Sequence, residues 1–206
     1  MKKLAVFCSG FGSNLQAIIN AISKGTLKAQ IRLVVSDKVD AYALVRARRA
    51  GIAVMYTDPA EFKTRASYDL NILKRLKKDK IDIVILAGYL RIISPNFIKH
   101  YRNRIINIHP ALLPSFKGVH GIRDALNYGV KVTGVSVHFV NEDLDAGPLI
   151  LQQAIKIKDN ETPESLARRI HSLEHKLYPQ AVKLLVENKL VVSKRKVLIR
   201  KQNRKK

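Results

Sequence analysis

The stretch that decides the fold is "LAVFCSGFGSNLQAIINAI", residues 4–22. Its first five residues carry no charge and are nearly all apolar, which predicts a strand buried on both faces. After a segment with two glycines, apolar residues recur as on one face of a helix: Leu15, Ile18, Ile19 and Ile22. A buried strand that leads directly into an amphipathic helix is typical of a parallel α/β sheet.

The same alternation continues along the chain. Apolar runs at residues 31–36, 52–56, 83–86 and 105–108 predict further strands, and helical patterns at 41–50 and 68–78 lie between them. Two strands then follow in close succession, at 132–140 and 149–157, which favours an antiparallel pair.

A long helix is predicted over residues 162–188. Thr162 is its expected N-cap and Pro163 its first residue, while Pro179 is expected to kink or interrupt it. We therefore predict a single α/β domain over residues 1–193, with a mostly parallel, doubly wound sheet, antiparallel C-terminal strands and a long C-terminal helix.

Residues 194–206 are predicted to form a basic C-terminal tail. Eight of these thirteen residues are Lys or Arg and none is acidic. We expect a solvated, partly frayed terminus, and the alternative is a segment that contacts nucleic acid.

Composition narrows the class of protein. The 206 residues are 47% hydrophobic and carry a formal charge of +22, so a folded domain that attracts anionic ligands is expected. The single cysteine, Cys8, excludes an intrachain disulfide. The start "MKKLAVFC" has too short an apolar part for a signal peptide, and no segment is long enough to cross a membrane. We predict a cytoplasmic protein with no membrane contact.

The first candidate site is the glycine loop, "CSGFGSNLQ" at residues 8–16. Gly10 and Gly12 allow backbone N–H groups to approach a ligand, and Ser13 or Asn14 is able to cap the helix that follows. A dinucleotide fingerprint needs a glycine where this chain has Leu15, although Asp37 lies where a ribose-binding acid is expected. A phosphate monoester site is favoured, and a plain turn is the alternative.

The second candidate site is "NIHPALLPSF", residues 107–116. His109 follows a predicted strand, at the end of the sheet where ligands bind, and Pro110 stiffens the backbone after it. Asn107 points to the same face, so an amide and an imidazole are able to hold a carbonyl oxygen as it becomes an oxyanion. His138, inside a strand pattern, is expected to be a structural residue.

Two acids form the third candidate site. Asp143 and Asp145 precede the turn-forming pair Gly147-Pro148. A carboxylate from this loop that lay against His109 would raise the pKa of the imidazole. The alternative is that both acids are simply solvated.

The motifs that are absent from the sequence limit the kinds of catalysis that this chain can perform. The chain contains no "G-x-S-x-G" elbow, no Walker loop and no zinc-ligand spacing, and Cys8 lies inside a strand pattern. Amide, imidazole and carboxylate groups suit acid–base and oxyanion chemistry on a carbonyl, without a metal.

Five motifs, in order, resemble those of the glycinamide ribonucleotide formyltransferases: "SGFGSNLQ", "ILAGYLRIISP", "NIHPALLPSFKG", "TGVSVHFV" and "LDAGPLI". The likeness extends over residues 3–190, and "N-I-H-P" followed by "D-x-G-P" is typical of the wider folate-dependent formyltransferase superfamily. It implies transfer of a formyl group from 10-formyltetrahydrofolate to the amine of a phosphoribosylglycinamide, in purine biosynthesis. It also implies small-molecule substrates, no specific nucleic acid, and a monomer or homodimer.

The resemblance also implies site residues. The catalytic group would be Asn107, His109 and Asp145. The substrate phosphate and ribose would be held by Gly12, Ser13, Asn14, Leu15, Gln16 and Glu174. The folate would contact Arg65, Leu90, Arg91, Ile92, Ile93, Asn107, Val140, Asn141 and Asp145. Asp37 departs from the family, which often has Asn there.

Two other functions remain open. A formyltetrahydrofolate deformylase would use the same catalytic trio, although it normally has an additional N-terminal domain and this chain begins at the first strand. A basic nucleic-acid-binding module would account for the charge but not for Asn107, His109 or the glycine loop, and aromatic residues make up only 6% of the chain.

Overall fold

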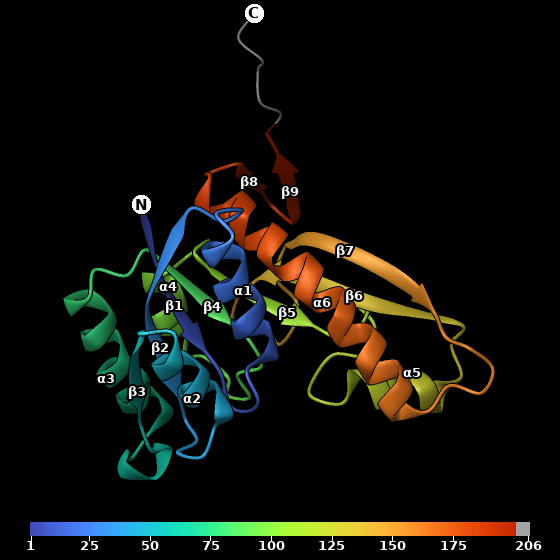
Figure 1. Ribbon diagram of the computed structural model, residues 1–206, viewed down its shortest axis with the longest axis horizontal. Coiled ribbons are helices and arrows are strands. Elements are labelled where there is room, and N and C mark those ends of the chain that lie inside the picture. The colour runs from blue at the N-terminus through green and yellow to red at the C-terminus, as the bar shows by residue number, and fades with distance from the viewer. Residues whose placement is uncertain (201–206) are drawn as a thin grey trace, which may run out of the picture.

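The computed structural model describes residues 1–200 and contains a seven-stranded sheet in the order β3-β2-β1-β4-β5-β6-β7 (Figure 1). The strands are β1 (Lys2–Phe7), β2 (Ala29–Ser36), β3 (Ala53–Tyr56), β4 (Ile83–Leu86), β5 (Ile105–His109), β6 (Val132–Phe139) and β7 (Leu149–Lys156). The first five are parallel, and β6 and β7 are antiparallel to their neighbours. The predicted doubly wound sheet with antiparallel C-terminal strands is confirmed.

Helices cover both faces of the sheet. They are α1 (Ser13–Ser23), α2 (Tyr42–Arg49), η1 (Pro59–Glu61), α3 (Arg65–Lys78), α4 (Pro95–His100), α5 (Gly121–Tyr128) and α6 (Pro163–Val186). The helices α1, α2 and α6 share one hydrophobic cluster, and α3 and α4 share the other.

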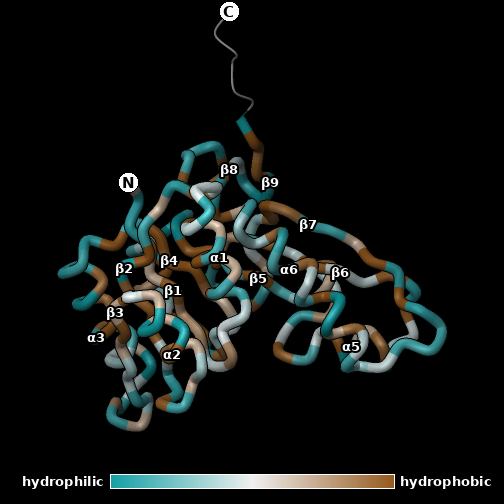
Figure 2. The backbone as a smooth tube through the Cα atoms, viewed as in Figure 1, coloured by the Kyte–Doolittle hydropathy of each residue, from teal (hydrophilic) through white to brown (hydrophobic). Residues whose placement is uncertain are grey.

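The strand sequence explains the two clusters. In β1, Leu4 and Val6 belong to the cluster under α1 and α6, whereas Ala5 and Phe7 belong to the cluster under α3. Alternate side chains of a strand point to opposite faces, so a strand covered on both faces must be apolar throughout. Figure 2 shows hydrophobic residues gathered along strands at the centre of the sheet.

The long helix α6 is continuous across Pro179, so the predicted interruption is wrong. Side-chain contacts hold the helix on the sheet next to the proline. The hydroxyl of Tyr178, fully buried, lies 2.7 Å from the carbonyl oxygen of Leu86 and 3.1 Å from that of Ile106, and donates to them. The predicted cap is confirmed, because Thr162 Oγ1 accepts a hydrogen bond from the backbone N–H of Ser165 at 3.2 Å.

After α6 the chain forms a hairpin of β8 (Leu190–Ser193) and β9 (Lys196–Ile199). The expected fraying is therefore wrong for Lys196–Ile199, although all of these side chains except that of Val197 are exposed. Val192 and Val197 face each other across the hairpin and both pack against the cluster under α6, which accounts for the ordered strand. The rest of the predicted tail, residues 201–206, lies outside the described residues.

The order of the strands locates a ligand site. From β1 the chain first builds the sheet outward on one side, through β2 to β3. It then returns to place β4 on the other side of β1 and continues outward to β5, so the strand order reverses between β1 and β4. A crevice at the carboxyl ends of strands opens at such a reversal. Within residues 1–200, none of the helices has the length and apolar character needed to cross a membrane.

Candidate active site

A cavity of about 1090 Å³ lies at the carboxyl ends of β1, β4 and β5. Its walls come from the glycine loop, the segment after β4, the end of β5, the loop between β6 and β7, and α6. The cavity therefore occupies the reversal in strand order, where doubly wound sheets bind ligands.

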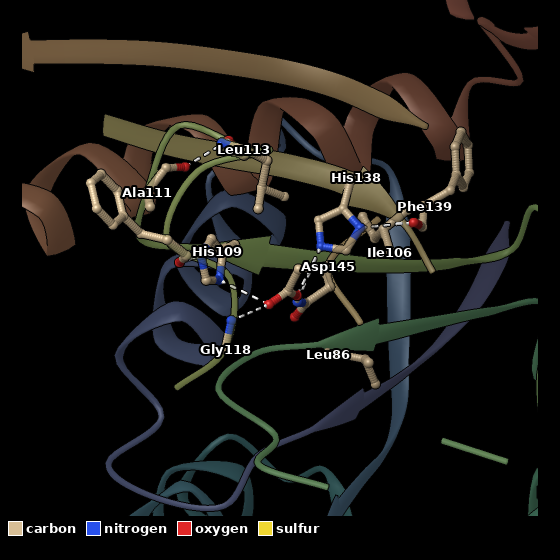
Figure 3. A network of polar contacts seen from close by, with 12 residues as sticks. Leu86, Ile106, His109, Ala111, Leu113, Gly118, His138, Phe139 and Asp145 are labelled. Carbon is tan, nitrogen blue, oxygen red and sulfur yellow. Dashed lines mark hydrogen bonds and ion pairs between the residues drawn. The ribbon is translucent and has the colours of Figure 1, made fainter. Parts of the chain in front are cut away.

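A carboxylate lies between two imidazoles in this cavity (Figure 3). Asp145 Oδ2 is 3.4 Å from Nδ1 of His109, and Oδ1 is 3.5 Å from Nε2 of His138. The amide nitrogen of Asn107 contacts both Asp145 Oδ1, at 3.4 Å, and His138 Nε2, at 3.3 Å. The backbone N–H of Gly118 donates to Asp145 Oδ2 at 2.9 Å.

Strand geometry brings most of this group together. Asn107 and His109 are two residues apart on β5, so their side chains leave the same face. His109 is the last residue of β5, not a residue beyond it as the sequence suggested. His138 stands directly opposite Asn107 in the antiparallel pairing of β5 with β6.

The loop that carries Asp145 is held against β6. A Cβ atom on Gly147 would lie 1.7 Å from the carbonyl oxygen of Phe139, so only glycine allows this approach. The backbone N–H of Phe139 donates to the carbonyl of Pro148 at 2.9 Å. Asp145 itself has a φ of 47°, a left-handed conformation that turns the chain back toward the strand ends.

Burial and the neighbouring groups have opposite effects on the pKa of His109. Burial lowers the pKa below its ordinary value, and this outweighs the opposing effects of Asp145 and of the Phe116 carbonyl, which raise it. The predicted direction of the carboxylate's effect is confirmed, and burial, whose depth the sequence did not reveal, outweighs it.

Both ring nitrogens of His109 face acceptors. Nδ1 faces Asp145, and Nε2 lies 2.7 Å from the carbonyl oxygen of Phe116. A neutral imidazole carries one N–H, so one of these acceptors receives no proton until the ring is protonated. A negative charge brought to the ring would therefore stabilise its imidazolium form.

Asp145 remains a carboxylate. Burial raises its pKa, but the contact with His138, the hydrogen bond from the Gly118 N–H and the nearby imidazoles outweigh burial and hold the pKa below its ordinary value. His138 Nδ1 donates to the carbonyl of Phe139 at 2.8 Å, which leaves Nε2 toward Asn107 and Asp145. His138 was expected to be only structural, and its place opposite Asn107 on the next strand was the signal that could have identified it.

The glycine loop forms the other end of the cavity. Gly12, with a φ of 73°, is the N-cap of α1, and no side chain caps the helix, so the predicted cap by Ser13 or Asn14 is wrong. The amide of Asn14 instead donates to Glu174 Oε2 at 2.9 Å, which joins α1 to α6. The first N–H groups of a helix have no partner within it, so they are left for a ligand.

Glu174 also contacts a histidine at this end. Its Oε2 lies 3.0 Å from His171 Nδ1, and this hydrogen bond raises the pKa of His171 above its ordinary value. Burial, in contrast, lowers the pKa of the neighbouring His175.

Buried polar atoms without a partner mark the same cavity. Among residues 1–200 there are five such side-chain atoms, and four of them belong to residues that line the cavity: Asn14 Oδ1, Arg91 Nε, Asn141 Oδ1 and His175 Nε2. A buried polar atom without a hydrogen bond is destabilising, so such atoms at a cavity indicate that a bound ligand supplies their partners.

Most of the predicted site residues line this one cavity. They are Gly12, Ser13, Asn14, Leu90, Arg91, Ile92, Ile93, Asn107, His109, Val140, Asn141, Asp145 and Glu174. Three predicted residues do not. Leu15 is fully buried in the core, Gln16 is hydrogen-bonded to Asn20 and Arg46, and Arg65 is exposed at the start of α3.

The surroundings of Asp37 and Cys8 indicate structural roles for both residues. Asp37 accepts a hydrogen bond from the hydroxyl of Ser9 at 2.6 Å, and that hydroxyl accepts one from the backbone N–H of Leu90. Asp37 is therefore occupied in joining the loops after β1, β2 and β4. Burial raises the pKa of Cys8 to about 12, so its thiol is not a nucleophile at neutral pH. No cluster of three or more His, Cys, Asp or Glu side chains in residues 1–200 is arranged to hold a metal ion.

Comparison with known proteins gives one family. The family described as formyl transferase matches residues 2–182. The chain is 40% identical to the phosphoribosylglycinamide formyltransferase of Bacillus subtilis (strain 168), with 90% of this chain and 95% of that protein covered. It is 41% identical to the protein of the same name from Escherichia coli (strain K12), with 91% and 88% covered.

Solved structures agree with these relatives. The crystal structure of glycinamide ribonucleotide transformylase 1 from Symbiobacterium toebii superposes with a TM-score of 0.96 at 43% identity, and 98% of this chain and 95% of that chain are covered.

Proposed function

This chain belongs to the formyl transferase family. From that membership we propose which residues bind each substrate and which take part in catalysis. Its activity is transfer of a formyl group to phosphoribosylglycinamide in purine biosynthesis. The proposal concerns the donor, the binding of each substrate and the role of each catalytic side chain.

We propose 10-formyltetrahydrofolate as the formyl donor, bound by the segment after β4 and the loop before β7. Leu90 and Ile92 expose large apolar side chains beside the cavity, as suits a flat ring system. Arg91 Nε and Asn141 Oδ1 are buried without partners in the same wall, where polar ring atoms could satisfy them. When bound, the folate supplies the formyl group. Arg65 stays a predicted contact because it does not line the cavity.

The phosphoribosyl part of the acceptor is proposed to bind at the glycine loop. Backbone N–H groups at the start of α1 and the positive end of the helix dipole favour a phosphate. Glu174, held by Asn14 and His171, is positioned to accept hydrogen bonds from ribose hydroxyls. Leu15 can contribute through its backbone N–H group, since its side chain is buried in the core. The backbone N–H of Gln16 already donates to the carbonyl oxygen of Gly12 at 3.0 Å, so Gln16 stays a predicted contact.

Asn107 and His109 are proposed to stabilise negative charge on the formyl oxygen. The present contacts of the Asn107 amide are long, at 3.3 and 3.4 Å. Nε2 of His109 lies against a neutral carbonyl, while Nδ1 faces Asp145. An oxygen that gains negative charge is a stronger acceptor than these, so both N–H groups would turn to it.

Asp145 is proposed to serve as the proton partner of His109. The attacking amine loses one proton and the departing folate nitrogen gains one. His109 and Asp145 can therefore pass a proton from the first to the second and return to their starting protonation states. The low pKa of Asp145 keeps it ionised, and its charge favours the imidazolium form of His109 while the oxyanion exists.

The observation that carries this assignment is the convergence of Asn107, His109 and Asp145 on one cavity. They come from two separate segments of the chain, and four residues with unpartnered buried polar atoms line the same cavity. A deformylase would use the same trio, so the requirement for an acceptor is what separates the two reactions.

The experiment measures folate turnover with and without phosphoribosylglycinamide. We expect turnover only with the acceptor, and a comparable rate without it would establish the hydrolase instead. His109→Ala is expected to lower kcat by about 10²–10⁴-fold through loss of acid–base catalysis. His100→Ala, a change at an exposed histidine on α4, is the matched control and should leave kcat unchanged.

The remaining predictions concern the setting of the enzyme. We propose that it acts in the cytoplasm as a monomer or homodimer, without specific nucleic acid and without a metal. Its high positive charge suits anionic small molecules, namely a phosphate ester and the carboxylates of a folate.

A further inference from the structure

Arg46, on α2, packs against two aromatic rings beside the glycine loop. Its Cζ lies 4.4 Å from the ring centroid of Phe11 and 4.9 Å from that of Tyr42. The two rings are stacked, with centroids 5.2 Å apart. Phe11 is 64% exposed, so its ring serves as a support for the guanidinium more than as part of the core.

The same guanidinium is hydrogen-bonded to both sides of the loop segment at the start of α1. Nε donates to the carbonyl oxygen of Phe11 at 2.9 Å, and Nη1 donates to Oε1 of Gln16 at 3.1 Å. Residues 12–15 lie between these two anchors along the chain, and the first three of them line the cavity. One planar side chain thus spans the segment that would bind phosphate.

Other contacts from α2 reinforce this support. The backbone N–H of Ala43 donates to the carbonyl of Gly10 at 3.1 Å. A Cβ atom on Gly12 would lie 2.7 Å from Cβ of Ala43, so the loop already touches the helix. Arg46 is the α2 side chain that adds hydrogen bonds to this close packing.

We propose that Arg46 is a positioning residue that holds the N–H groups of residues 12–15 in place for the substrate phosphate. The proposal rests on the proposed function, because it assumes that the phosphate binds at the glycine loop. Arg46 would act through the loop, and its contribution would therefore depend on the phosphate and not on the folate.

Arginine is required for this role because of its shape. Its fork presents two N–H groups at fixed angles to Phe11 O and Gln16 Oε1, whereas lysine is a point charge and cannot span both acceptors in the same way. Substitution by lysine can therefore separate the contribution of the positive charge from that of the two hydrogen bonds made by the guanidinium.

The experiment compares Arg46→Met and Arg46→Lys with the wild-type protein. Arg46→Met should raise KM for phosphoribosylglycinamide about tenfold, as for loss of one charge-assisted hydrogen bond, with kcat and KM for the folate within about twofold. Arg46→Lys keeps the charge and should recover only part of the loss. Arg49→Met is the matched control, since Arg49 contacts Tyr42 and makes no hydrogen bond to the loop.

A second readout uses the acceptor without its phosphate. Wild-type protein should prefer the phosphorylated acceptor, and Arg46→Met should reduce that preference by the same factor as it raises KM. Calorimetric Kd values for the phosphorylated ligand measure the effect independently of turnover.

Several results would overturn the role of Arg46. These are an equal rise in both KM values, full recovery in Arg46→Lys, or an unchanged preference for the phosphorylated acceptor in Arg46→Met. Absence of acceptor-dependent turnover in the wild-type protein would instead overturn the proposed function, and the Kd comparison would still test Arg46.

Discussion

At the residue scale, the candidate active site is a carboxylate shared by two imidazoles and an amide. Asp145 receives the N–H of Gly118 and contacts Asn107, His109 and His138, so it organises every donor in the group. His109 is held between opposing effects, since burial disfavours its charge and Asp145 favours it. This balance makes the protonation of His109 sensitive to charge on a bound substrate.

The balance predicts the effect of Asp145→Asn on His109. The substitution removes the charge that raises the pKa of the imidazole while burial, which lowers it, remains, so the pKa should fall further. An NMR pH titration of labelled histidines measures this midpoint, with the His109 signal assigned from its loss in His109→Gln. Asp143→Asn, in an exposed part of the same loop, is the control. A midpoint that stayed the same or rose in Asp145→Asn would show that the carboxylate does not act on His109.

At the element scale, the C-terminal hairpin supports the loop that carries Asp145. Arg195, in the turn between β8 and β9, donates to the carbonyl of Ala146 at 3.4 Å. On β9, Val197 faces the core and Leu198 is 58% exposed. The sequence did not predict β9, because basic residues surround the apolar side chain of Val197 that faces the core.

This arrangement predicts a difference between two adjacent residues of β9. Val197→Ala should lower the free energy of unfolding by about 1 kcal/mol, since it removes partly buried apolar groups. Leu198→Ala should change it by less than about 0.5 kcal/mol, because that side chain faces solvent. Urea unfolding curves of the two variants provide the test. Equal effects would mean that β9 does not pack on the domain in solution.

At the scale of the whole molecule, the excess of positive charge belongs to the entire chain. There are 38 basic residues and 16 acidic ones, and the predicted tail accounts for only eight of the basic residues. The cavity sits at the reversal of the sheet, so a phosphate at one end and a folate at the other would both approach through this positive field.

The charge predicts a salt dependence of substrate capture. Raising KCl from about 0.05 to 0.5 M should lower kcat/KM for phosphoribosylglycinamide, because screening shortens the reach of the surface charges. The value of kcat should change little, since the proposed catalytic group is buried and is screened much less than the surface. Steady-state kinetics with the acceptor lacking its phosphate is the control and should show a weaker dependence. A fall in kcat with unchanged kcat/KM would contradict the steering of anions by the surface.

The sequence by itself determined the features that depend on neighbours along the chain. The apolar strands, the helix face of Leu15 and Ile18, and the Thr162 cap all follow from short-range periodicity and backbone chemistry. Asn107 and His109 were predicted to share a face because side chains alternate along any strand. The family resemblance then indicated Asp145 in preference to Asp143.

Only the tertiary structure decided how these pieces act on one another. It brought His138 beside Asn107 and Asp145, joined Asn14 to Glu174 across 160 residues, and placed Arg46 against the glycine loop. It also buried His109 so deeply that burial outweighs the effect of Asp145 on the pKa of the imidazole. The reason is physical: distances between remote segments and the depth of a side chain below the surface are set by packing, which local sequence patterns do not encode.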